Sequence, residues 1–474
     1  MNEELSNKDI PLWDQSFRDH LTTVSEDGKS KYIKPTKPKG KWFNRRAVLA
    51  VLYYAAFFTV PFIKVNGRPL LLFDFFNGKF ILFGKAFWPQ DFFVLGLIML
   101  AAILFIAIFT VAYGRIFCGW ICPQTIFMEM LFRRVDFLIL GTPANHRKWS
   151  NAPMSAKKVG IFSLRYGIYA LLSFIIANTF LSYIIGVDEL FKIITEPVSQ
   201  HLAGFIGIII FTAVFFGVYV FLREQVCTNI CPYGRMQSVL LDKHSIVVAY
   251  DYGRGEPRGK FKKDQGDLGD CIDCFQCVNV CPTGIDIRNG TQLECVNCTA
   301  CIDACDFMME KTGRPKGLIR YDSEFNIANN KAFTFTKRLK LYSAALIFLL
   351  VCIVSLLASR SNITGQILRT PGLLYQEKGT DSISNLFNIK IINKTLTNRM
   401  FELRLEDMNG AIQYVGKPYI AGKADDYSSA TFFVILPKTE VKNRKNEIKI
   451  GLYEQGEKIK TLKTNFLGPI AAMN

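Results

Sequence analysis

Cysteine is the residue type whose spacing points most directly to chemistry in this sequence. Eight of the 13 cysteines in the 474-residue chain form two runs with the same CxxCxxCxxxC spacing. The runs are Cys271, Cys274, Cys277 and Cys281, followed by Pro282, and then Cys295, Cys298, Cys301 and Cys305. Three thiolates on one tight loop can bind three irons of a cubane, whereas the fourth iron needs a ligand from elsewhere. The spacing therefore predicts two 4Fe–4S clusters.

The order of the cysteines also predicts which of them share a cluster. In bacterial two-cluster ferredoxins the fourth cysteine of each run binds the other cluster. We therefore assign two sets: Cys271, Cys274, Cys277 and Cys305 for the first cluster, and Cys295, Cys298, Cys301 and Cys281 for the second. Paired zinc knuckles would favour CxxC pairs with longer spacers. A radical enzyme that cleaves S-adenosylmethionine would need CxxxCxxC, a spacing that the sequence lacks.

Two further cysteine pairs form a repeated CxxxCP motif. They are Cys118-Gly-Trp-Ile-Cys122-Pro and Cys227-Thr-Asn-Ile-Cys231-Pro, and each directly follows an apolar stretch. Residues four apart on a helix lie on one face, so each pair could chelate one soft metal ion. Thiolates select Cu(I), zinc or iron–sulfur centres. Two alternatives stay open, namely a third iron–sulfur cluster on these four sulfurs and simple packing of small buried side chains.

The other soft or basic side chains show no metal-ligand spacing. Cys352 lies in an apolar stretch, where we expect it to pack, and we assign no role to the scattered His20, His146, His201 and His244. Met128 and Met130 follow the first CxxxCP motif and could serve as soft ligands, although methionine in apolar segments usually belongs to the core.

Five apolar stretches are long enough to cross a bilayer. Half of the residues are hydrophobic, and the mean hydropathy of +0.19 is high for a soluble protein. The predicted spans are 47–66, 92–114, 160–186, 203–222 and 341–359. Segment 67–91 is apolar too, but charged residues interrupt it, and we expect an interfacial hairpin there instead of a sixth span.

The net charge of +17 is explained by membrane orientation and not by nucleic-acid binding. Lysine and arginine number 10 in 1–46, 7 in 115–158 and 17 in 223–340, against 4 in 64–91 and 1 in 187–202. Because basic loops stay on the cytoplasmic side, this asymmetry predicts that the N-terminus and the cysteine runs are cytoplasmic. Five spans then place the C-terminal tail on the opposite face. No cleavable signal peptide is expected in the polar first 46 residues.

The pattern divides the chain into regions of different character. In the tail, apolar and polar residues alternate, as at Phe387, Ile389 and Ile391, which predicts strands of an immunoglobulin-like β-sandwich. The predicted regions are an N-terminal segment 1–46, a membrane domain 47–240, a ferredoxin-like domain 241–335, a fifth span 341–359 and the sandwich 360–474. The predicted fold is thus an α-helical membrane domain with a ferredoxin-like insert and a C-terminal β-sandwich.

Taken in order, these motifs resemble those of the FixG/CcoG family, membrane accessory proteins of cbb3-type cytochrome c oxidase. The resemblance covers nearly the whole chain and follows the family's cysteine pattern without a departure. It is carried by FWPQDF at 87–92, RIFCGWICPQT at 115–125, LREQVC at 222–227, VAYD at 248–251, GEPRG at 255–259, CPTGIDIR at 281–288, GLIRY at 317–321 and INKT at 392–395.

The resemblance implies an oxidoreductase, a cupric reductase that supplies Cu(I) for the copper centre of the oxidase. Copper would be the substrate ion and two 4Fe–4S clusters the cofactors, with the catalytic site at Cys118, Cys122, Cys227 and Cys231. The protein would lie in the bacterial inner membrane with its tail in the periplasm. The expected partners are the lipid bilayer, the oxidase or its copper chaperones, and a cytoplasmic electron donor. Nucleic acid is excluded, and a homodimer is left open.

Two other functions are compatible with the same residues. The first is a quinol-linked electron-transfer protein that feeds a periplasmic reductase, because such systems also combine CxxxCP spans with ferredoxin runs. The second is a non-enzymatic assembly factor whose clusters sense redox state while the sandwich docks the oxidase. Copper reduction by the reduced protein distinguishes the first expectation from both.

Overall fold

The chain folds as two compact units, Met1–Ile353 and Val354–Asn474. The computed structural model describes residues 32–76, 78–88, 91–260, 268–331, 334–359, 361–370, 374–379 and 381–469, apart from the side chains of Arg235 and Ser238. Most of the N-terminal segment predicted at 1–46, including His20, and the Pro-Gln pair of the FWPQDF motif lie outside these residues.

Five helices of the first unit are long and apolar enough to cross a membrane. They are α1 (Lys41–Thr59, continued as a 3-10 turn to Phe62), α2 (Phe92–Tyr113), α7 (Ala156–Ile185), α9 (Leu202–Gly217, continued as a π-helix to Leu222) and α15 (Lys337–Ala358). The prediction of five apolar helices is confirmed. Their bounds differ from the predicted ones. The first, third and fifth helices begin four to six residues earlier than the hydropathy pattern indicates.

Two of the early starts are explained by hydrogen bonds to the first turns, which hydropathy does not register. The Ser155 hydroxyl accepts a hydrogen bond from the Lys158 amide and caps α7. At α1, the amides of Trp42 and Phe43 donate to the carboxylate of Asp303, a residue far away in sequence. The first span also ends at Phe62 instead of residue 66, because the chain then turns into short strands.

The segment between the first two spans consists of short antiparallel strands. These are β1 (Lys64–Val65), β2 (Arg68–Pro69), β3 (Leu71–Asp74), β4 (Lys79–Leu82) and β5 (Lys85–Phe87). β1 pairs with β2, and β3, β4 and β5 form a three-stranded sheet. Segment 67–91 is therefore a set of hairpins and contains no sixth span among its described residues.

Short helices connect the spans and carry the CxxxCP motifs. They are α3 (Ile116–Trp120), α4 (Pro123–Phe127), a π-helix (Met128–Phe132), α5 (Arg133–Ile139), α6 (Pro143–Asn151), α8 (Val187–Thr195), a second π-helix (Val226–Ile230) and α10 (Pro232–Leu240). Aromatic side chains fill the space between the spans, where Phe132 stacks on Tyr219 and meets Tyr169 edge-on. This packing fixes both motifs at one end of the helical bundle.

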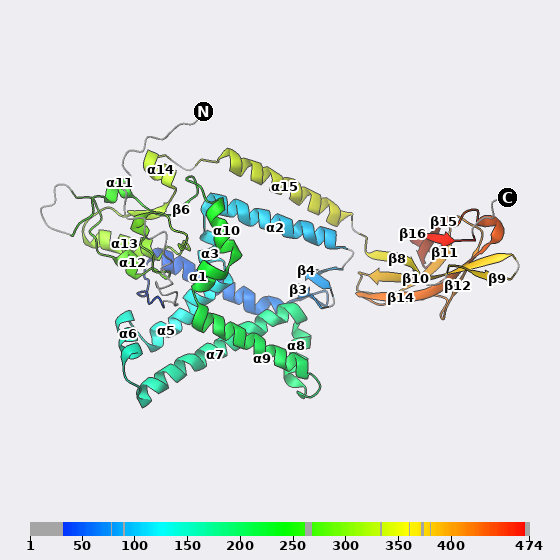
Figure 1. Ribbon diagram of the computed structural model, residues 1–474, viewed down its shortest axis with the longest axis horizontal. Coiled ribbons are helices and arrows are strands. Elements are labelled where there is room, and N and C mark those ends of the chain that lie inside the picture. The colour runs from blue at the N-terminus through cyan, green and yellow to red at the C-terminus, as the bar shows by residue number, and fades with distance from the viewer. Residues whose placement is uncertain are drawn as a thin grey trace. The chain divides into compact units, whose positions relative to one another are not determined.

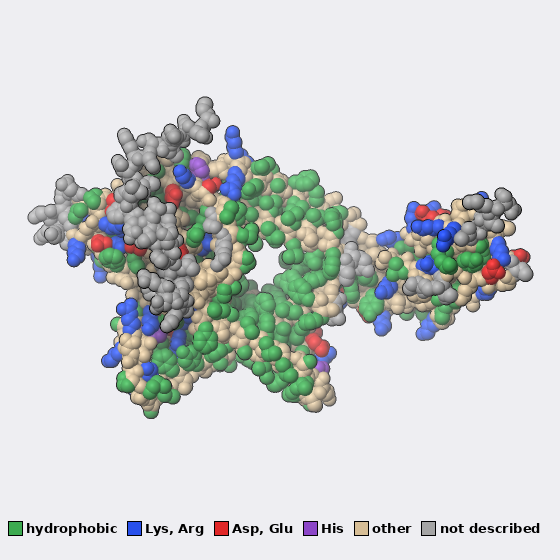
Figure 2. Space-filling view, viewed as in Figure 1, with side chains coloured by type: hydrophobic (Ala, Val, Ile, Leu, Met, Phe, Trp, Pro, Cys, Tyr) green, Lys and Arg blue, Asp and Glu red, His purple; other side chains and the backbone are tan. Residues whose placement is uncertain are grey.

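The outward faces of the spans remain apolar. Met99 and Ile103 of α2 and Phe348 of α15 are each about 60–70% exposed. Figure 2 shows hydrophobic side chains covering these helices, which lie side by side in Figure 1 because Leu339 packs against Val111. A continuous apolar surface of this kind is favourable in contact with lipid and unfavourable in contact with water.

A small ferredoxin-like domain follows the second CxxxCP motif. Strand β6 (Val247–Tyr250) pairs with β7 (Ile319–Asp322) in antiparallel fashion. The helices are α11 (Tyr252–Gly255), α12 (Gln276–Asn279), a 3-10 turn (Ile287–Asn289), α13 (Ala300–Lys311) and α14 (Glu324–Asn329). The core of this domain contains apolar side chains together with cysteines of both runs.

The second unit is a sandwich of two antiparallel sheets. The first sheet has the order β12-β14-β10-β8, with β9 also paired to β10, and the second has the order β13-β11-β15-β16. The strands are β8 (Ile363–Arg369), β9 (Gln376–Lys378), β10 (Ser382–Asn393), β11 (Arg399–Leu405), β12 (Ala411–Tyr414), β13 (Ile420–Gly422), β14 (Asp426–Pro437), β15 (Lys445–Glu454) and β16 (Glu457–Leu467).

The alternating residues of the tail form the interior of this sandwich. Phe387, Ile389 and Ile391 of β10 are fully buried, as are Phe401 of β11 and Ile450 of β15. Their polar neighbours point outward, which is the period of two expected for a strand with one buried face. The predicted β-sandwich is confirmed.

Candidate functional site

The two cysteine runs fold in the same way. In the first run Asp273 and Phe275 have positive φ angles of 52° and 56°, and in the second Asn297 and Thr299 have 52° and 65°. Each of these residues directly flanks the second cysteine of its run. Positive φ is strained for residues other than glycine, so its repetition at matching positions indicates a backbone bent around a bulky group.

The first cavity has a volume of about 340 Å³ and is lined by one set of four cysteines. These are Cys271, Cys274, Cys277 and Cys305. The other lining residues include Tyr250, Met309 and Arg288, the last of which stacks over Phe275 at 4.2 Å from the ring centre. The structure therefore brings the last cysteine of the second run to the first three of the first run.

The second cavity, also about 340 Å³, is lined by the remaining four cysteines of the runs, with Cys277 at its edge. These four are Cys281, Cys295, Cys298 and Cys301. In the described part of the chain, no three His, Cys, Asp or Glu side chains converge closely enough to hold one metal ion. A mononuclear zinc site needs such convergence, whereas a cubane separates its four sulfurs. Both cavities thus fit a 4Fe–4S cluster.

The protonation of these thiols supports the same conclusion. Burial raises the pKa of Cys277 and of Cys295 to about 12, and it raises the pKa of Cys298 to about 11. Without a metal such thiols stay protonated at neutral pH, because the apolar surroundings disfavour the thiolate. A coordinating metal deprotonates a thiol outright, so these buried sulfurs are suited to bind a metal centre.

The CxxxCP motifs do not lie on continuous helices, contrary to the one-face expectation. α3 carries Cys118 and ends at Trp120, whereas Cys122 is extended (φ −59°, ψ 126°) and precedes Pro123, the first residue of α4. Proline is favoured at this helix position because its missing amide would have no partner there. A new helix therefore starts at each proline and turns the second cysteine out of line with the first.

The second motif repeats this break. Cys227 lies on a π-helix that ends at Ile230, and Cys231 is extended (φ −67°, ψ 115°) before Pro232 opens α10. The spans before the motifs also end alike, at Gly114 (φ 57°) and at Arg223 (φ 45°). The internal repeat seen in the sequence is thus a repeat of backbone conformation.

The two repeats bind each other reciprocally. The Cys118 sulfur lies 3.3 Å from the Gln237 amide nitrogen of the second repeat, and the Cys227 sulfur lies 3.7 Å from the Thr125 hydroxyl of the first. Likewise Gln124 donates to the Arg223 carbonyl at 3.2 Å. Each cysteine turn is therefore held by the helix that follows the other one.

These contacts gather the four cysteines into one region, called the CxxxCP site below. Burial raises the pKa of Cys118 to about 11 and of Cys227 to about 12, and the negative charges of neighbouring cysteines of the set add to both rises. The same effects raise the pKa of Cys122. Among the described residues, no three of these side chains converge on a single ion.

The CxxxCP site lies directly against the second cysteine run. A Cβ atom added at Gly119 would lie 2.3 Å from the Val296 carbonyl oxygen, so only glycine allows this approach. The Trp120 indole nitrogen donates to the Asn297 carbonyl at 3.2 Å. A third cavity of about 300 Å³ is lined by Cys227 together with Thr283 and Val296, which also line the second cavity. Two residues thus form a wall common to both sites.

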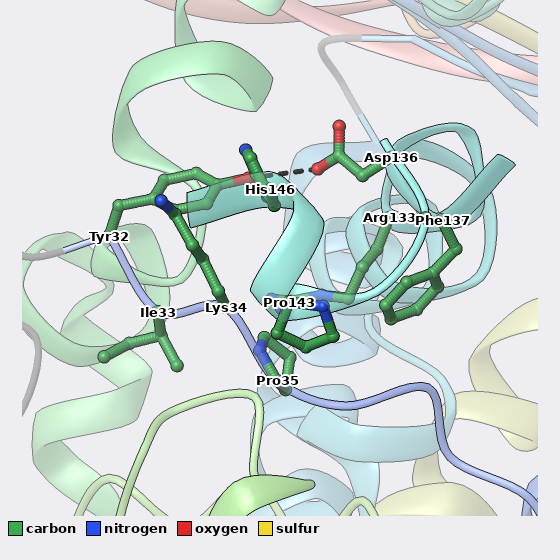
Figure 3. Close-up of a pocket in the computed structure, with 10 residues that line it drawn as sticks. Tyr32, Ile33, Lys34, Pro35, Arg133, Asp136, Phe137, Pro143 and His146 are labelled. Carbon is green, nitrogen blue, oxygen red and sulfur yellow. Dashed lines mark hydrogen bonds between the residues drawn. The ribbon is translucent and has the colours of Figure 1, made fainter. Parts of the chain in front are cut away.

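A buried ionic network fixes the end of the fourth span, four residues before Cys227. The Asp136 carboxylate accepts hydrogen bonds from Arg165 at 2.7 Å and from Arg223 at 3.2 Å. Figure 3 shows the Tyr32 hydroxyl donating to the same carboxylate, beside His146. Burial raises the pKa of Asp136, but the charges of Arg223 and Arg165 outweigh it and the pKa falls to about 2.

Sequence reasoning missed this network, although one signal was present. Arg165 is an ionisable residue within an apolar span, and such residues usually face a partner inside the bundle. Its partner Asp136 lies in a short helix without any motif. Burial and the charge of Lys34 lower the pKa of His146, at the edge of the network, to about 4.

The weaker sequence candidates occupy unremarkable positions. Cys352 is half-buried on α15, and Met128 lines the third cavity. Met130 packs against Ala50 and Ile126 in a small apolar cluster. His201 lies 2.6 Å from Glu196.

Comparisons with known proteins agree with the cysteine geometry. Three family models match the chain: "4Fe-4S binding domain" at residues 93–141, "4Fe-4S dicluster domain" at 222–324, and one described as an IG-like fold at the C-terminal of FixG at 353–469. The predictions of iron–sulfur binding and of a FixG-type tail are thus confirmed, and the first model covers Cys118 and Cys122.

Relatives match along most of the chain. Protein RdxA of Cereibacter sphaeroides is 33% identical over 408 residues, which are 83% of this chain and 85% of RdxA. The nitrogen fixation protein FixG of Rhizobium meliloti is 31% identical over 316 residues, 64% of this chain and 59% of FixG. A solved FixG-related protein from Vibrio parahaemolyticus aligns with 23% of this chain, and with all of its own, at 15% identity and a TM-score of 0.21. The chain is an iron–sulfur electron-transfer protein of the membrane and belongs to the FixG/RdxA family.

Proposed function

We propose that the protein is a membrane-bound cupric reductase in which electrons from the ferredoxin-like domain reduce Cu(II) at the CxxxCP site. One observation carries this proposal: Thr283 and Val296 line both the second cavity and the cavity that contains Cys227. An electron held at the second set of cysteines is therefore separated from the Cys227 cavity by a wall that is one residue thick. The four cysteines that line each of the two cavities would hold a 4Fe–4S cluster, which supplies one-electron transfer when bound.

The surroundings of this wall keep the two sites at a fixed separation. Gly119 packs against the Val296 carbonyl, and Trp120 donates to Asn297, between two cysteines of the second run. The Trp120 indole also donates to the Tyr321 hydroxyl at 3.1 Å, and Trp42 meets both rings edge-on. These contacts hold the CxxxCP turn on the ferredoxin-like domain and exclude water from the contact.

The chemistry of the CxxxCP site suits copper as the substrate. Cu(I) is a soft ion that prefers thiolates, so sulfur ligands stabilise the reduced product more than Cu(II). Burial keeps the thiols of Cys118 and Cys227 protonated, and Cu(I) binding would displace those protons. The redox step itself moves one electron from a reduced cluster to Cu(II) and transfers no proton.

The charge distribution supports a definite orientation for this reaction. Basic residues concentrate in 115–158 and 223–340, which favours a cytoplasmic location for the CxxxCP site and the ferredoxin-like domain. A low-potential one-electron donor of the cytoplasm would then reduce the clusters. The sandwich would face the periplasm, and Cu(I) would go to cbb3-type cytochrome oxidase or its copper chaperones.

A cysteine variant of the full-length protein tests the copper site. Changing both Cys122→Ser and Cys231→Ser removes one sulfur from each motif and leaves all eight cysteines of the runs intact. We expect Cu(II) reduction to be lost while the EPR signals of the reduced clusters are unchanged. Cys352→Ser is the matched control, because it removes a half-buried thiol of α15 far from both motifs. Full copper reduction by the double variant would refute the proposal.

A third iron–sulfur cluster at the CxxxCP site is the second candidate, and the 4Fe-4S binding domain match at residues 93–141 favours it. The protein would then relay electrons without binding copper, as in a quinol-linked system. Iron analysis distinguishes the two, with about eight irons per chain for two cubanes and about twelve for three. Loss of about four irons in the Cys122→Ser and Cys231→Ser variant would establish the third cluster.

A further inference from the structure

Two buried arginines beside the second cysteine run have no carboxylate partner among the described residues. Arg46 and Arg115 are only 3% and 5% exposed. The Arg46 Nε donates to the Gly119 carbonyl at 2.7 Å, and its Nη2 has no partner. Arg115 donates to the carbonyls of Leu293 and Gly234, and its Nε has no partner. Burying an unpaired charge costs several kcal/mol, so a counter-charge is expected nearby.

Both arginines face the second cysteine run. Leu293, which accepts from Arg115, lies two residues before Cys295. Gly119, which accepts from Arg46, packs on the backbone between Cys295 and Cys298. Burial raises the pKa of these two thiols, and the charges of Arg115 and Arg46 act against that rise at Cys295 and Cys298 respectively. The two guanidinium groups thus act on two different cysteines of one cluster-binding loop.

The first cavity differs in its charge balance. Its arginine, Arg288, is paired with Asp286 at 2.6 Å and with Asp273 at 2.5 Å. The Asp306 carboxylate also acts on Cys305. The carboxylates around the first cavity therefore outnumber its arginine.

Near the second set the carboxylate that acts on Cys298 is Glu129, which is already paired with Arg133. Arg46 and Arg115 therefore have no carboxylate partner of their own among the described residues.

We propose that Arg46 and Arg115 are the counter-charges of the second cluster and hold its reduction potential above that of the first. A 4Fe–4S cluster with four thiolates is an anion, and its reduced form carries one more negative charge. Positive charge nearby stabilises the reduced form and raises the potential. With both clusters bound, an electron delivered to the first set of cysteines would pass to the second set, beside the CxxxCP site, with no proton transferred.

The origin of the two arginines links this effect to the membrane helices. Arg46 lies in the first turns of α1, and Arg115 follows α2 directly. The N-terminus of α1 is bound by Asp303 of α13, as the proximity of these helices in Figure 1 indicates. The ferredoxin-like domain alone would therefore lack both charges, and the potential difference between the clusters depends on its contact with the spans.

The test uses the full-length protein in detergent, with anaerobic redox titration followed by EPR. This inference rests on the proposed cluster ligands, and a Cys274→Ser variant, which alters a ligand of the first set only, assigns the signals. We expect Arg46→Gln and Arg115→Gln each to lower the midpoint potential of the second cluster and leave the first unchanged. The equilibrium constant for electron transfer from the first cluster to the second should fall at least tenfold, which corresponds to about 59 mV for one electron.

Two further variants keep the test decisive. Arg45→Gln removes the same charge from the exposed neighbouring position, where its guanidinium lies over Trp42, and should leave both potentials unchanged. Arg115→Lys retains the positive charge. The midpoint potential of the second cluster in this variant should therefore stay close to that of the unmodified protein, even if the Arg115→Gln protein does not assemble its clusters. Unchanged potentials in both Gln variants, or a Lys variant as low as Gln, would overturn the inference. Absence of two cluster signals in the unmodified protein would instead refute the proposed function.

Discussion

The ferredoxin-like domain and the C-terminal sandwich build their interiors from different groups. The sandwich core is a cluster of apolar side chains such as Phe387, Phe432 and Ile450, and a buried polar side chain such as Asn393 is hydrogen-bonded to backbone carbonyls. The ferredoxin-like interior instead mixes Ile302 and Met309 with cysteines of both runs, and charged groups such as Arg288 line its cavities. One region can fold on hydrophobic burial, and the other contains groups that are unfavourable in the interior without a metal.

This difference shows where function resides in the molecule. Buried thiols, positive φ angles at non-glycine residues and unpaired arginines each destabilise the chain on its own. They occur together around the two cluster cavities. A bound cluster would offset their cost, because its irons bind the thiolates and its net negative charge balances the arginines. In the sandwich, by contrast, the interior follows the hydrophobic pattern with no buried cysteine. Four predictions test this contrast.

The largest effect should follow removal of iron. Because metal-binding free energy contributes directly to folding, apo protein should lose hydrogen-exchange protection in β6 and β7 almost completely. The amides of β10 and β14, which pair along their whole lengths, should exchange at unchanged rates. Equal protection of β6 in the apo and iron-loaded proteins would contradict the contrast.

A core truncation in the sandwich should give the converse result. Phe387→Ala removes a fully buried ring that stacks on Phe432 at 5.8 Å between ring centres. We expect the free energy of unfolding of the sandwich to fall by about 3–5 kcal/mol, measured by denaturant titration. The EPR signals of the clusters should not change. Loss of those signals would show that the two interiors are coupled.

The ionic network near Arg223 should give a smaller loss. Asp136→Asn removes the charge that Arg165 and Arg223 share but keeps an acceptor oxygen, so we expect a total loss of about 1.5–3 kcal/mol. Thermal unfolding in detergent measures the effect. Asp188→Asn is the control, since its pair with Lys64 at 2.8 Å is exposed and should contribute about 0–1 kcal/mol. Equal effects of the two changes would refute a structural role for the network.

The smallest effect should be a pH dependence from His146. Its pKa is lowered from 6.5 to about 4, so the unfolded chain binds more protons and stability falls as the pH drops from about 6.5 towards 4. Asp136 stays ionised in this window because its pKa is about 2. The unfolding temperature of a His146→Gln variant should depend less on pH between 6.5 and 4. An identical pH dependence in both proteins would contradict this assignment.

Much of this fold could be predicted from local patterns in the sequence. Apolar length indicated the spans, and the alternation at Phe387, Ile389 and Ile391 indicated a sandwich strand. The break between Cys118 and Cys122 also had a local signal, because Pro123 favours the start of a new helix. The four-residue spacing alone predicts that both cysteines lie on one face of a helix. The structure differs because Pro123 starts a new helix directly after Cys122.

The rest depends on contacts between distant residues. Asp303 binds the first turn of α1 across about 260 residues, and Gly119 packs on Val296 because glycine leaves room for it. No motif in the sequence links the two partners of either contact, and both contacts arise only when the spans and the ferredoxin-like domain fold together. The unpaired state of Arg46 and Arg115 likewise becomes visible only once their burial is known.

The measurement that tests the central claim most directly is an anaerobic copper titration. The full-length protein in detergent is reduced with dithionite, the excess is removed, and Cu(II) is added in steps. A Cu(I) chelator and EPR follow the copper and the clusters in parallel. We predict that Cu(I) appears in proportion to the loss of the reduced-cluster signal. Clusters that stay reduced while copper remains Cu(II) would contradict the account.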